Sequence, residues 1–373
     1  LAPAVFVHFG TSEEYWRMVA DDEALAHMCG WSRHAGAWLD PTLQLAGDGY
    51  VLINAALDAP PAVAPATLQQ PALITDSRLP CPHWQGRAII SGLLTERPLT
   101  LGADLVVHQL PVTRGVVTRL FGLSDDPKRL YTDAKATFLN RPFAAWLAEL
   151  GEPPETLWPH VPADQRTLWH ARLYPCTGDR EASLDLTLPL QAPADAPPAW
   201  REQWKAAERL SLAEGFILAD GQRILDDLAA VEDTIAAQHT AAAICEERPA
   251  EEAARALSLR DAAALERQCR LVEEWIAAGP QNLAWRGLAA LAVASRDPAY
   301  EDRAFAHLAQ AIEDDVIHRQ GQSRTSMRPA ATESAPARVA AAARIDFGGG
   351  WTDTPPYSIE RGGIVLNAAV TLR

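Results

Sequence analysis

Short apolar runs separated by turn residues dominate the chain between about residues 45 and 125. The runs lie at residues 50–53, 72–74, 87–90, 105–107 and 116–117, and Gly, Pro, Asp or Ser separate them. Stacked coils of a parallel β-helix produce this pattern, because each coil buries its inward side chains against the next coil. A β-sandwich gives a similar pattern, and the spacing here is uneven, with no strict hexapeptide repeat. We predict a β-helix-like domain, with the sandwich as the alternative.

Apolar and polar residues also alternate ahead of this region, at residues 5–9, which predicts a short strand. Thr11 and Glu14 then have the spacing of a capping box, in which the hydroxyl and the carboxylate cover the first free amides of a helix. We therefore expect the chain to open with a strand followed by a helix.

Aromatic-rich stretches follow the apolar runs, and we expect them to pack an extension against the β layer; they lie at residues 140–147, 158–159 and 168–175. Residues 191–198 are rich in proline, which restricts its own φ and the conformation of the residue before it. This stretch predicts a stiff connector and a domain boundary. Residues 1–195 are therefore expected to form one region.

Between residues 200 and 320, apolar positions recur at a spacing of three and four in a stretch rich in Ala, Leu, Glu and Arg. This spacing predicts a connector of successive amphipathic helices, with breaks at Gly279-Pro280 and Asp297-Pro298. A helical-repeat structure is compatible with the pattern, although no fixed period is visible. Residues 321–336 are polar and poor in bulky apolar side chains, which favours a linker before a new domain.

Composition excludes several classes of function. The chain has 373 residues, of which 48% are hydrophobic and 22% charged, as is typical of two or three globular domains. The formal net charge of -15 argues against a nucleic-acid partner and an anionic membrane surface, because both favour clustered Lys and Arg. No stretch approaches the roughly 18 consecutive apolar residues of a membrane span. We expect neither a nucleic-acid nor a membrane partner.

The cysteines and histidines show no metal-binding or redox pattern. The five cysteines are far apart, with no CxxC pair and no histidine at zinc-finger spacing; they are Cys29, Cys81, Cys176, Cys245 and Cys269. Neither a disulfide framework nor a metal site is indicated, and the reducing cytoplasm is the expected location. The histidines at positions 8, 83, 108 and 170 lack the carboxylate spacing of an acid–base or metal site, so we expect structural roles for them.

The candidate chemistry lies in residues 337–373. A strand is predicted at residues 341–347, and the three glycines at 348–350 then allow positive φ and a close approach of the backbone to a ligand. Trp351, Thr352 and Asp353 follow directly. An aspartate at such a turn can accept hydrogen bonds from two sugar hydroxyls, while an aromatic ring covers the apolar face of the sugar. A tight turn at a domain edge explains the glycines equally well. A second strand is predicted at residues 364–370.

The run AARIDFGGGWTDTPPYSIERGGIVLNAAVTL resembles the first motif of the GHMP sugar-kinase superfamily, which includes galactokinase and the homoserine, mevalonate and phosphomevalonate kinases. The form GGWTDTPP is similar to that of L-fucokinases. The resemblance implies the truncated start of an α+β kinase domain at residues 337–373.

At matching positions, the resemblance implies that Asp353 binds the sugar hydroxyls and that Arg344 is a catalytic residue near the reacting hydroxyl. Gly349, Gly350, Trp351 and Thr352 are the further substrate-binding residues it implies. Galactokinases have a glutamate at the position of Gly350 and a histidine at that of Trp351, so recognition of galactose is not implied.

The first two hundred residues carry a second resemblance. The pieces VFVHFGTSEEYW and LWHARLYP are similar to the distal part of the fucose-1-phosphate guanylyltransferase-like region that some family members carry in front of the kinase. The expected fold class is therefore mixed and multi-domain, with a parallel β-helix-like domain, an α-helical connector and the start of a kinase domain.

Together the resemblances imply a parent enzyme that transfers the γ-phosphoryl group of ATP, with Mg²⁺, to the anomeric hydroxyl of L-fucose. A bifunctional enzyme that also uses GTP to form GDP-fucose is the alternative, and a non-catalytic β and helical assembly module is a third. The oligomeric state is open, with a homo-oligomer as one option.

The ATP loop, the catalytic aspartate and the nucleotide loop of a guanylyltransferase have no counterpart in this sequence. The sequence begins at Leu1 without the marks of a signal peptide and ends at Arg373 within an alternating apolar stretch. We therefore expect an internal fragment that is inactive alone.

Overall fold

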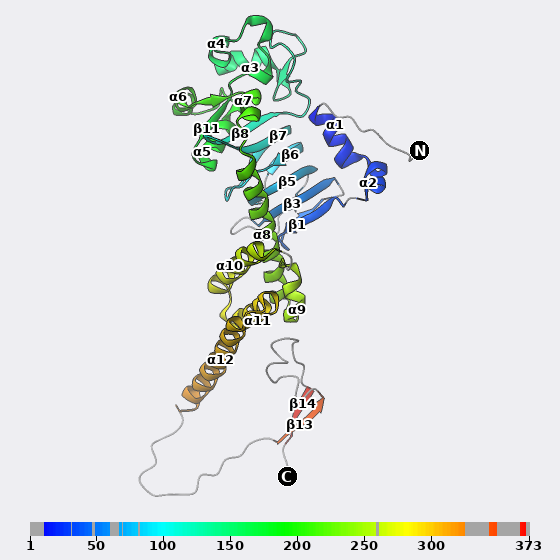
Figure 1. Cartoon of the computed structure of the whole chain (residues 1–373), viewed down its shortest axis with the longest axis vertical. Helices are drawn as coiled ribbons and strands as arrows, with labels where there is room; N and C mark the ends of the chain where they lie inside the picture. Colours follow the sequence, from blue (N-terminus) through cyan, green and yellow to red (C-terminus); the bar gives the residue numbers. More distant parts are fainter. Residues whose placement is uncertain are drawn as a thin grey trace. The chain divides into compact units, whose positions relative to one another are not determined.

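The computed structural model describes residues 11–30, 32–46, 49–59, 67–68, 70–80, 83–258, 261–324, 343–348 and 366–370 (Figure 1). Two compact units divide the chain, one formed by Leu1–Ile235 and the other by Ala236–Arg373. The first unit contains the apolar runs, the aromatic stretches and residues 221–235 of helix α8 (Gly221–Cys245). The later helices belong to the second unit.

The first unit is built on a β-solenoid-like sheet. Five strands pair in parallel in the order β1 (His34–Leu39), β3 (Tyr50–Asp58), β5 (Ala72–Pro80), β6 (His83–Ser91) and β7 (Thr100–Val112). A further parallel pair, β2 (Gln44–Leu45) and β4 (Thr67–Leu68), comes from the connections between these strands. The predicted β-helix-like domain is confirmed.

The last predicted run does not continue the parallel coils. Residues 116–117 lie on β8 (Gly115–Gly122), which turns back and pairs antiparallel with β7. β11 (Tyr174–Thr177) and β12 (Arg209–Leu210) then extend the same sheet antiparallel. The hairpin is possible because only two residues, Thr113 and Arg114, separate β7 from β8.

Left-handed residues stack at one corner of the coils. Gly36, Asn54, Asp76 and Gly92 occupy neighbouring positions in the register of β1, β3, β5 and the end of β6, and their φ angles are 55°, 49°, 52° and 63°. Gly, Asn and Asp are the residues that adopt this conformation most readily. The Nδ2 of Asn54 also donates to Oδ1 of Asp76 at 3.1 Å, which links two successive corners.

Both faces of the parallel strands are buried. Leu52, Ile74 and Ile90 face the main core, whereas their neighbours Val51, Leu73 and Ile89 pack under a helical segment at the start of the chain. That segment contains α1 (Ser12–Trp16), which begins with the predicted capping box of Thr11 and Glu14. Burial on both faces explains why the strands read as continuous apolar runs instead of alternating ones.

The aromatic extension packs against the sheet as predicted. It includes α3 (Phe143–Leu150) and α4 (Pro154–Leu157), and Trp146 and Trp158 are buried in the same core as the inward strand residues. The indole N–H of Trp146 donates to the Leu190 carbonyl at 2.9 Å. Burial of these rings therefore leaves no polar group of Trp146 without a partner.

Three helices follow within the first unit: α5 (Arg180–Thr187), α6 (Pro198–Ala206) and α7 (Leu212–Ile217). The compact unit extends past the boundary predicted near residue 195, because Trp200 and Trp204 of α6 are buried in its main core. The proline-rich stretch is thus followed by a helix that packs back onto the core.

The predicted helical series is also present. It comprises α8 (Gly221–Cys245), which contains the division between the units, and α9 (Ala250–Ala253), α10 (Ala262–Ala278), α11 (Ala284–Ser295) and α12 (Pro298–Arg324). Gly279 ends α10 and Pro298 opens α12, at the predicted breaks. Helices α10 and α11 approach closely at Gly287, where a β-carbon would lie 2.7 Å from Ile276. Within the described residues, no helix is both long and apolar enough to cross a membrane.

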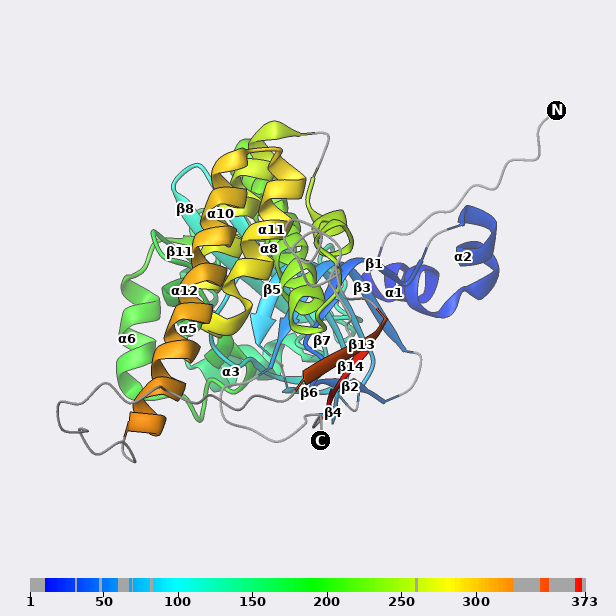
Figure 2. The same ribbon diagram turned by 90° about the horizontal axis from the view of Figure 1, so that it is seen from below.

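Two further strands belong to the second unit, in the segment with the candidate sugar motif. β13 (Ala343–Gly348) and β14 (Leu366–Val370) pair antiparallel, with Arg344 opposite Ala369 and Gly348 opposite Leu366. Both strands predicted in this segment are therefore present. Figure 2 shows the same ribbon from a second direction.

Candidate functional site

The predicted sugar motif is only partly described by the structure. Arg344 lies on β13, in register with Ala369. Gly349, Gly350, Trp351, Thr352 and Asp353 lie outside the described residues. The assignment of these six residues to a sugar site stays a prediction.

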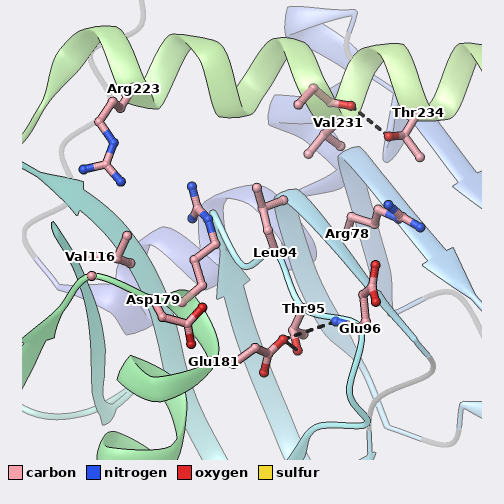
Figure 3. A pocket seen from close by; sticks show the side chains of 13 residues that line it. Arg78, Leu94, Thr95, Glu96, Val116, Asp179, Glu181, Arg223, Val231 and Thr234 are labelled. Atoms are coloured by element: carbon pink, nitrogen blue, oxygen red, sulfur yellow. Dashed lines mark hydrogen bonds between the residues drawn. The ribbon is translucent and has the colours of Figure 1, made fainter. Parts of the chain in front are cut away.

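A separate cavity of about 480 Å³ lies within the first unit. It is lined by Arg78 near the end of β5, the loop that follows β6, the start of α5 and the first half of α8 (Figure 3). Arg223 extends from α8 into this space, and Leu94 and Val231 face one another across it. The cavity lining therefore combines polar groups with apolar side chains.

Arg180 is held rigidly at the cavity. Its Nη2 donates to both carboxylate oxygens of Asp227 on α8, each at 2.6 Å, and its Nη1 donates to Oε1 of Gln109 at 3.1 Å. Gln109 is itself buried and donates to the backbone carbonyl of Arg180 at 3.2 Å. Such a two-sided clamp fixes both the position and the plane of the guanidinium.

Arg223 is anchored by the backbone of the β7–β8 hairpin. Its Nη1 donates to the carbonyls of Val112 at 3.1 Å and Gly115 at 2.9 Å. These contacts attach α8 to the end of the sheet. They also leave the positive charge of Arg223 without a carboxylate in hydrogen-bonding contact, as far as the described residues extend.

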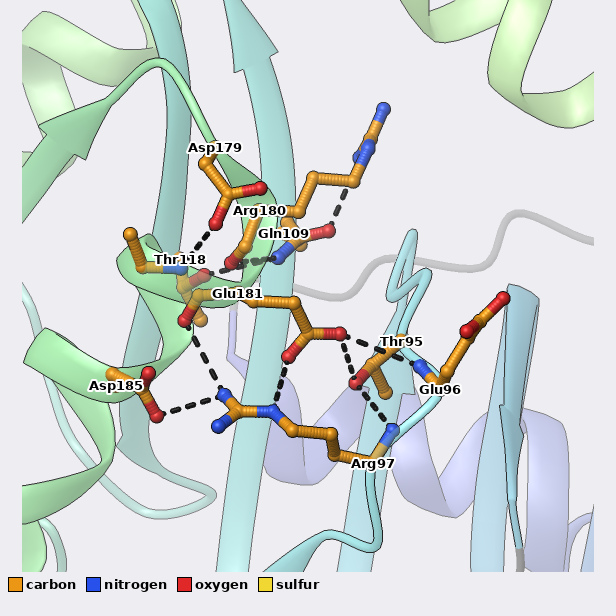
Figure 4. A network of polar contacts seen from close by, with 10 residues as sticks. Thr95, Glu96, Arg97, Gln109, Thr118, Asp179, Arg180, Glu181 and Asp185 are labelled. Atoms are coloured by element: carbon orange, nitrogen blue, oxygen red, sulfur yellow. Dashed lines mark hydrogen bonds and ion pairs between the residues drawn. The ribbon is translucent and has the colours of Figure 1, made fainter.

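Two of the three carboxylates that line the cavity, those of Asp179 and Glu181, are already engaged. Asp179 is the N-cap of α5 and accepts from the Ala182 amide at 2.8 Å. Glu181 accepts from the Thr95 hydroxyl at 2.6 Å and from Nε of Arg97 at 2.7 Å (Figure 4). These contacts bind the loop after β6 to the start of α5.

Arg97 completes this network with a second ion pair, in which its Nη2 donates to Asp185 at 2.7 Å. The hydrogen bonds to Asp185 and Glu181 raise the pKa of the Arg97 guanidinium. The two ion pairs of Arg97 therefore fix α5 against the solenoid.

The cavity suits binding rather than catalysis. Its described lining contains arginines, carboxylates, two threonines, a glycine and apolar residues, and it contains no histidine, cysteine or lysine. A nucleophile or a general base that works near neutral pH is normally one of those three types or a carboxylate with a raised pKa. Asp179 and Glu181 are engaged by donors, and Nε of Arg78 pairs with Asp58 at 3.4 Å. The groups that remain for a ligand are therefore the Glu96 carboxylate and the other N–H groups of Arg78 and Arg223.

Residues of this cavity could not be predicted from the sequence. They come from segments that are far apart along the chain, and Arg180 is 47 positions from its partner Asp227 on α8. The one local signal is the Asp179 N-cap pattern before α5, which indicates a helix start and not a ligand site.

The remaining candidate groups are the cysteines and the side chains that could bind a metal ion. Burial, and secondarily the charge of Glu208, raises the pKa of the Cys176 thiol, which disfavours the reactive thiolate. No group of three or more His, Cys, Asp or Glu side chains is arranged to hold a metal ion in the part of the chain that the structure describes.

Comparison with known proteins connects this architecture to a family. Residues 1–179 match the family model of the fucose pyrophosphorylase domain. The chain is 26% identical over 311 residues to the bifunctional fucokinase/GDP-fucose pyrophosphorylase of Arabidopsis thaliana, a match that covers 75% of this chain and 28% of that protein.

A short match is much closer. Over 29 residues the chain is 66% identical to the L-fucokinase/L-fucose-1-P guanylyltransferase of Bacteroides fragilis, which covers 8% of this chain and 3% of that protein. No solved structure matches the chain. The chain thus corresponds to well under two thirds of the length of either curated relative.

The first unit therefore contains a β-solenoid-like sheet and a polar cavity, and residues 1–179 of the chain match the fucose pyrophosphorylase domain. The predicted resemblance of the chain to fusions of L-fucokinase with fucose-1-phosphate guanylyltransferase is confirmed. The assignment of residues 337–373 to the GHMP superfamily stays a prediction.

Proposed function

We propose that this chain is part of an L-fucokinase, which transfers the γ-phosphoryl group of ATP to the anomeric hydroxyl of L-fucose and gives fucose-1-phosphate. The observation that carries the proposal is the match to two curated relatives whose names both contain fucokinase activity. The motif from Arg344 to Asp353, which resembles that of L-fucokinases, supports the same reading.

In the proposed kinase reaction, Asp353 accepts hydrogen bonds from sugar hydroxyls and Arg344 lies near the transferred phosphoryl group. An arginine there would counter the negative charge that spreads over the phosphoryl oxygens in the transition state. Mg²⁺ bound to ATP would neutralise charge on the phosphates. No residue of this chain is assigned to ATP binding.

A second activity is favoured by a separate observation. The family model that matches residues 1–179 is that of the pyrophosphorylase domain, not of the kinase. We therefore propose as the second candidate a bifunctional parent, which also joins fucose-1-phosphate to GTP, with release of pyrophosphate, to give GDP-fucose. The kinase product would then be the pyrophosphorylase substrate within one polypeptide.

The fucose-salvage proposal places the enzyme in the cytoplasm, where ATP and GTP are available and where thiols stay reduced. The four cysteines within the described residues, Cys29, Cys176, Cys245 and Cys269, are free thiols, which agrees with that location. A homo-oligomer stays a prediction that sedimentation of the parent enzyme would test.

The decisive experiment is a coupled assay of ADP release by the full-length parent, with L-fucose, D-arabinose, galactose and a heptose offered in turn. We expect ADP release that depends on L-fucose. Release with another sugar alone would keep a sugar kinase and change the substrate, while no release with any sugar would favour the third interpretation, a non-catalytic assembly module.

The second activity has its own assay, release of pyrophosphate from GTP in the presence of fucose-1-phosphate. Pyrophosphate release together with ADP release identifies the bifunctional enzyme. ADP release without it leaves the kinase alone.

A further inference from the structure

Arg209 is a partly buried cation with no carboxylate partner. It lies on β12, and its guanidinium carbon is 4.0 Å from the centre of the Trp204 ring. Its Nη2 donates to the Thr156 carbonyl at 3.4 Å, whereas its Nη1 is buried and has no hydrogen-bond partner among the described residues. A buried donor without an acceptor is costly, so its presence calls for an explanation.

The carboxylates near Arg209 are committed to other cations. Glu152 pairs with Lys205 at 2.6 Å. Glu214 accepts from Arg172 at 3.0 Å and also closes the capping box at the start of α7. Neither acid is free to neutralise Arg209.

The surroundings of Arg209 lower the pKa of its guanidinium. Burial, together with the like charge of Arg172, lowers the pKa of the Arg209 guanidinium to about 10, although Glu152 offsets part of the effect. The structure thus holds a cation in a place that disfavours positive charge.

This cation lines a second cavity, of about 460 Å³, in the first unit. Arg114 and Arg172 also line it, and the only carboxylates among its described lining residues are Glu208 and Glu214. The described lining therefore contains three arginines and two glutamates, which leaves one excess positive charge. The lining also includes the apolar residues Pro159, Leu210, Ile217 and Leu218.

We propose that this cavity is a binding site for a small phosphorylated ligand, whose phosphoryl group is held by Arg209 and Arg172. A phosphoryl group carries three acceptor oxygens and can accept from two guanidinium groups at once. Binding would balance the excess positive charge of the cavity lining. The cavity is larger than a phosphoryl group, so its apolar residues are available to a sugar or a base attached to it.

This inference does not depend on the fucose-salvage proposal, since it uses only the charges and the space around Arg209. The competing explanation is that stacking on Trp204 alone holds Arg209 in place and that the cavity stays without a ligand.

The test is calorimetric titration of inorganic phosphate into the full chain at constant ionic strength, with acetate as a second anion. We expect saturable binding of phosphate, at least tenfold weaker in Arg209→Gln. The matched control Arg129→Gln, which removes an arginine paired with Asp126 and Asp133 outside the cavity lining, should bind as the unaltered chain does. No saturable phosphate binding, or equal binding in Arg209→Gln, would overturn the proposal.

A second pair of variants keeps the test valid if Arg209→Gln does not fold. Ile217 lines the cavity and is 77% exposed, so both Ile217→Glu and Ile217→Gln should fold. A carboxylate at this position would compete with phosphate and weaken its binding, whereas the amide should not. Equal phosphate binding in the two variants would contradict the site.

The same titration with a sugar 1-phosphate and with a nucleoside monophosphate distinguishes the two sources of the phosphoryl group. If one of these ligands binds more tightly than inorganic phosphate, its sugar or nucleoside is the group that fits against the apolar residues of the cavity. Binding of acetate as tight as that of phosphate would overturn the assignment to a phosphorylated ligand.

Discussion

Arg180 and Asp227 join α5 to α8 through two hydrogen bonds of 2.6 Å, made by one nitrogen of the guanidinium to both oxygens of the carboxylate. Both side chains are about three-quarters buried, at 24% and 23% exposed. The pair therefore connects the start of α5, which packs on the sheet, to the helix that covers the first cavity. An ion pair at this depth contributes more than one on the open surface, but it leaves a charge without a partner if it is broken.

Asp227→Asn should lower the free energy of unfolding by about 1–3 kcal/mol, because it removes the charge partner of Arg180 and leaves only Gln109. Urea unfolding of the full chain measures this change. The neighbouring Asp226→Asn is the control, since Asp226 is exposed and contacts only Gln222 of its own helix. Equal destabilisation by the two variants would show that the Arg180–Asp227 pair has no special role.

Gly92→Ala should be one of the most destabilising changes in the solenoid. Gly92 has a φ of 63°, and a β-carbon there would lie 2.6 Å from the Gln109 carbonyl oxygen, which belongs to the backbone and cannot move aside cheaply. The expected loss is about 3 kcal/mol or more, from the left-handed conformation and the collision together.

Gly36→Ala separates these two causes. Gly36 has a similar φ of 55°, but no atom lies within 4 Å of a β-carbon placed there, so a loss of about 1 kcal/mol is expected. Thermal unfolding of the two variants compares them directly. A loss in Gly36→Ala as large as in Gly92→Ala would mean that conformation and not close contact dominates at the corners.

His108 should make the first unit less stable in mild acid. Burial, and secondarily the charge of Arg119, lowers the pKa of His108 to about 3, and its Nδ1 contacts Nη2 of Arg119 across the β7–β8 pair. The unfolded chain, with an ordinary histidine pKa of about 6.5, binds more protons than the folded chain between these values. The stability due to neutral His108 is therefore present above about pH 6.5 and is lost as the pH falls towards 3.

The comparison is urea unfolding at pH 7 and pH 5. His108→Gln, which keeps an acceptor for Arg119, should lose up to about 2 kcal/mol less than the unaltered chain over this interval. His83→Gln removes an exposed histidine and should keep the full pH dependence. An unchanged pH dependence in His108→Gln would show that His108 is not the titrating group.

Asp353→Ala in the full-length parent should raise the KM for L-fucose sharply and leave the KM for ATP unchanged, because the carboxylate is proposed to bind only the sugar. Arg344→Ala should mainly lower kcat, by about 100-fold or more, because its charge is proposed to act on the transferred group. Steady-state kinetics of ADP release give both quantities. An unchanged KM for fucose in the first variant, or a full kcat in the second, would remove that residue from the site.

The sequence by itself determined the local elements. Apolar runs at residues 50–53, 72–74, 87–90 and 105–107 became parallel strands because a run of apolar residues can be buried on both faces of a sheet. Thr11 and Glu14 defined a helix start through contacts only three residues apart. The family resemblance was also a local property, carried by contiguous motifs in which each residue type occupies a set position.

Only the tertiary structure decided how these elements pair and what lies between them. The run at residues 116–117 looks like the others, yet it turns back antiparallel, because the β7–β8 connection is too short for another coil. Burial of the whole core brings together the stacked corners at Asn54 and Asp76, and likewise the cavity residue Arg180 and its partner Asp227. Local periodicity predicts which side of a strand or helix is apolar, but not which distant segment packs against that side. Both cavities form between segments that are distant in the sequence, so they depend on this packing.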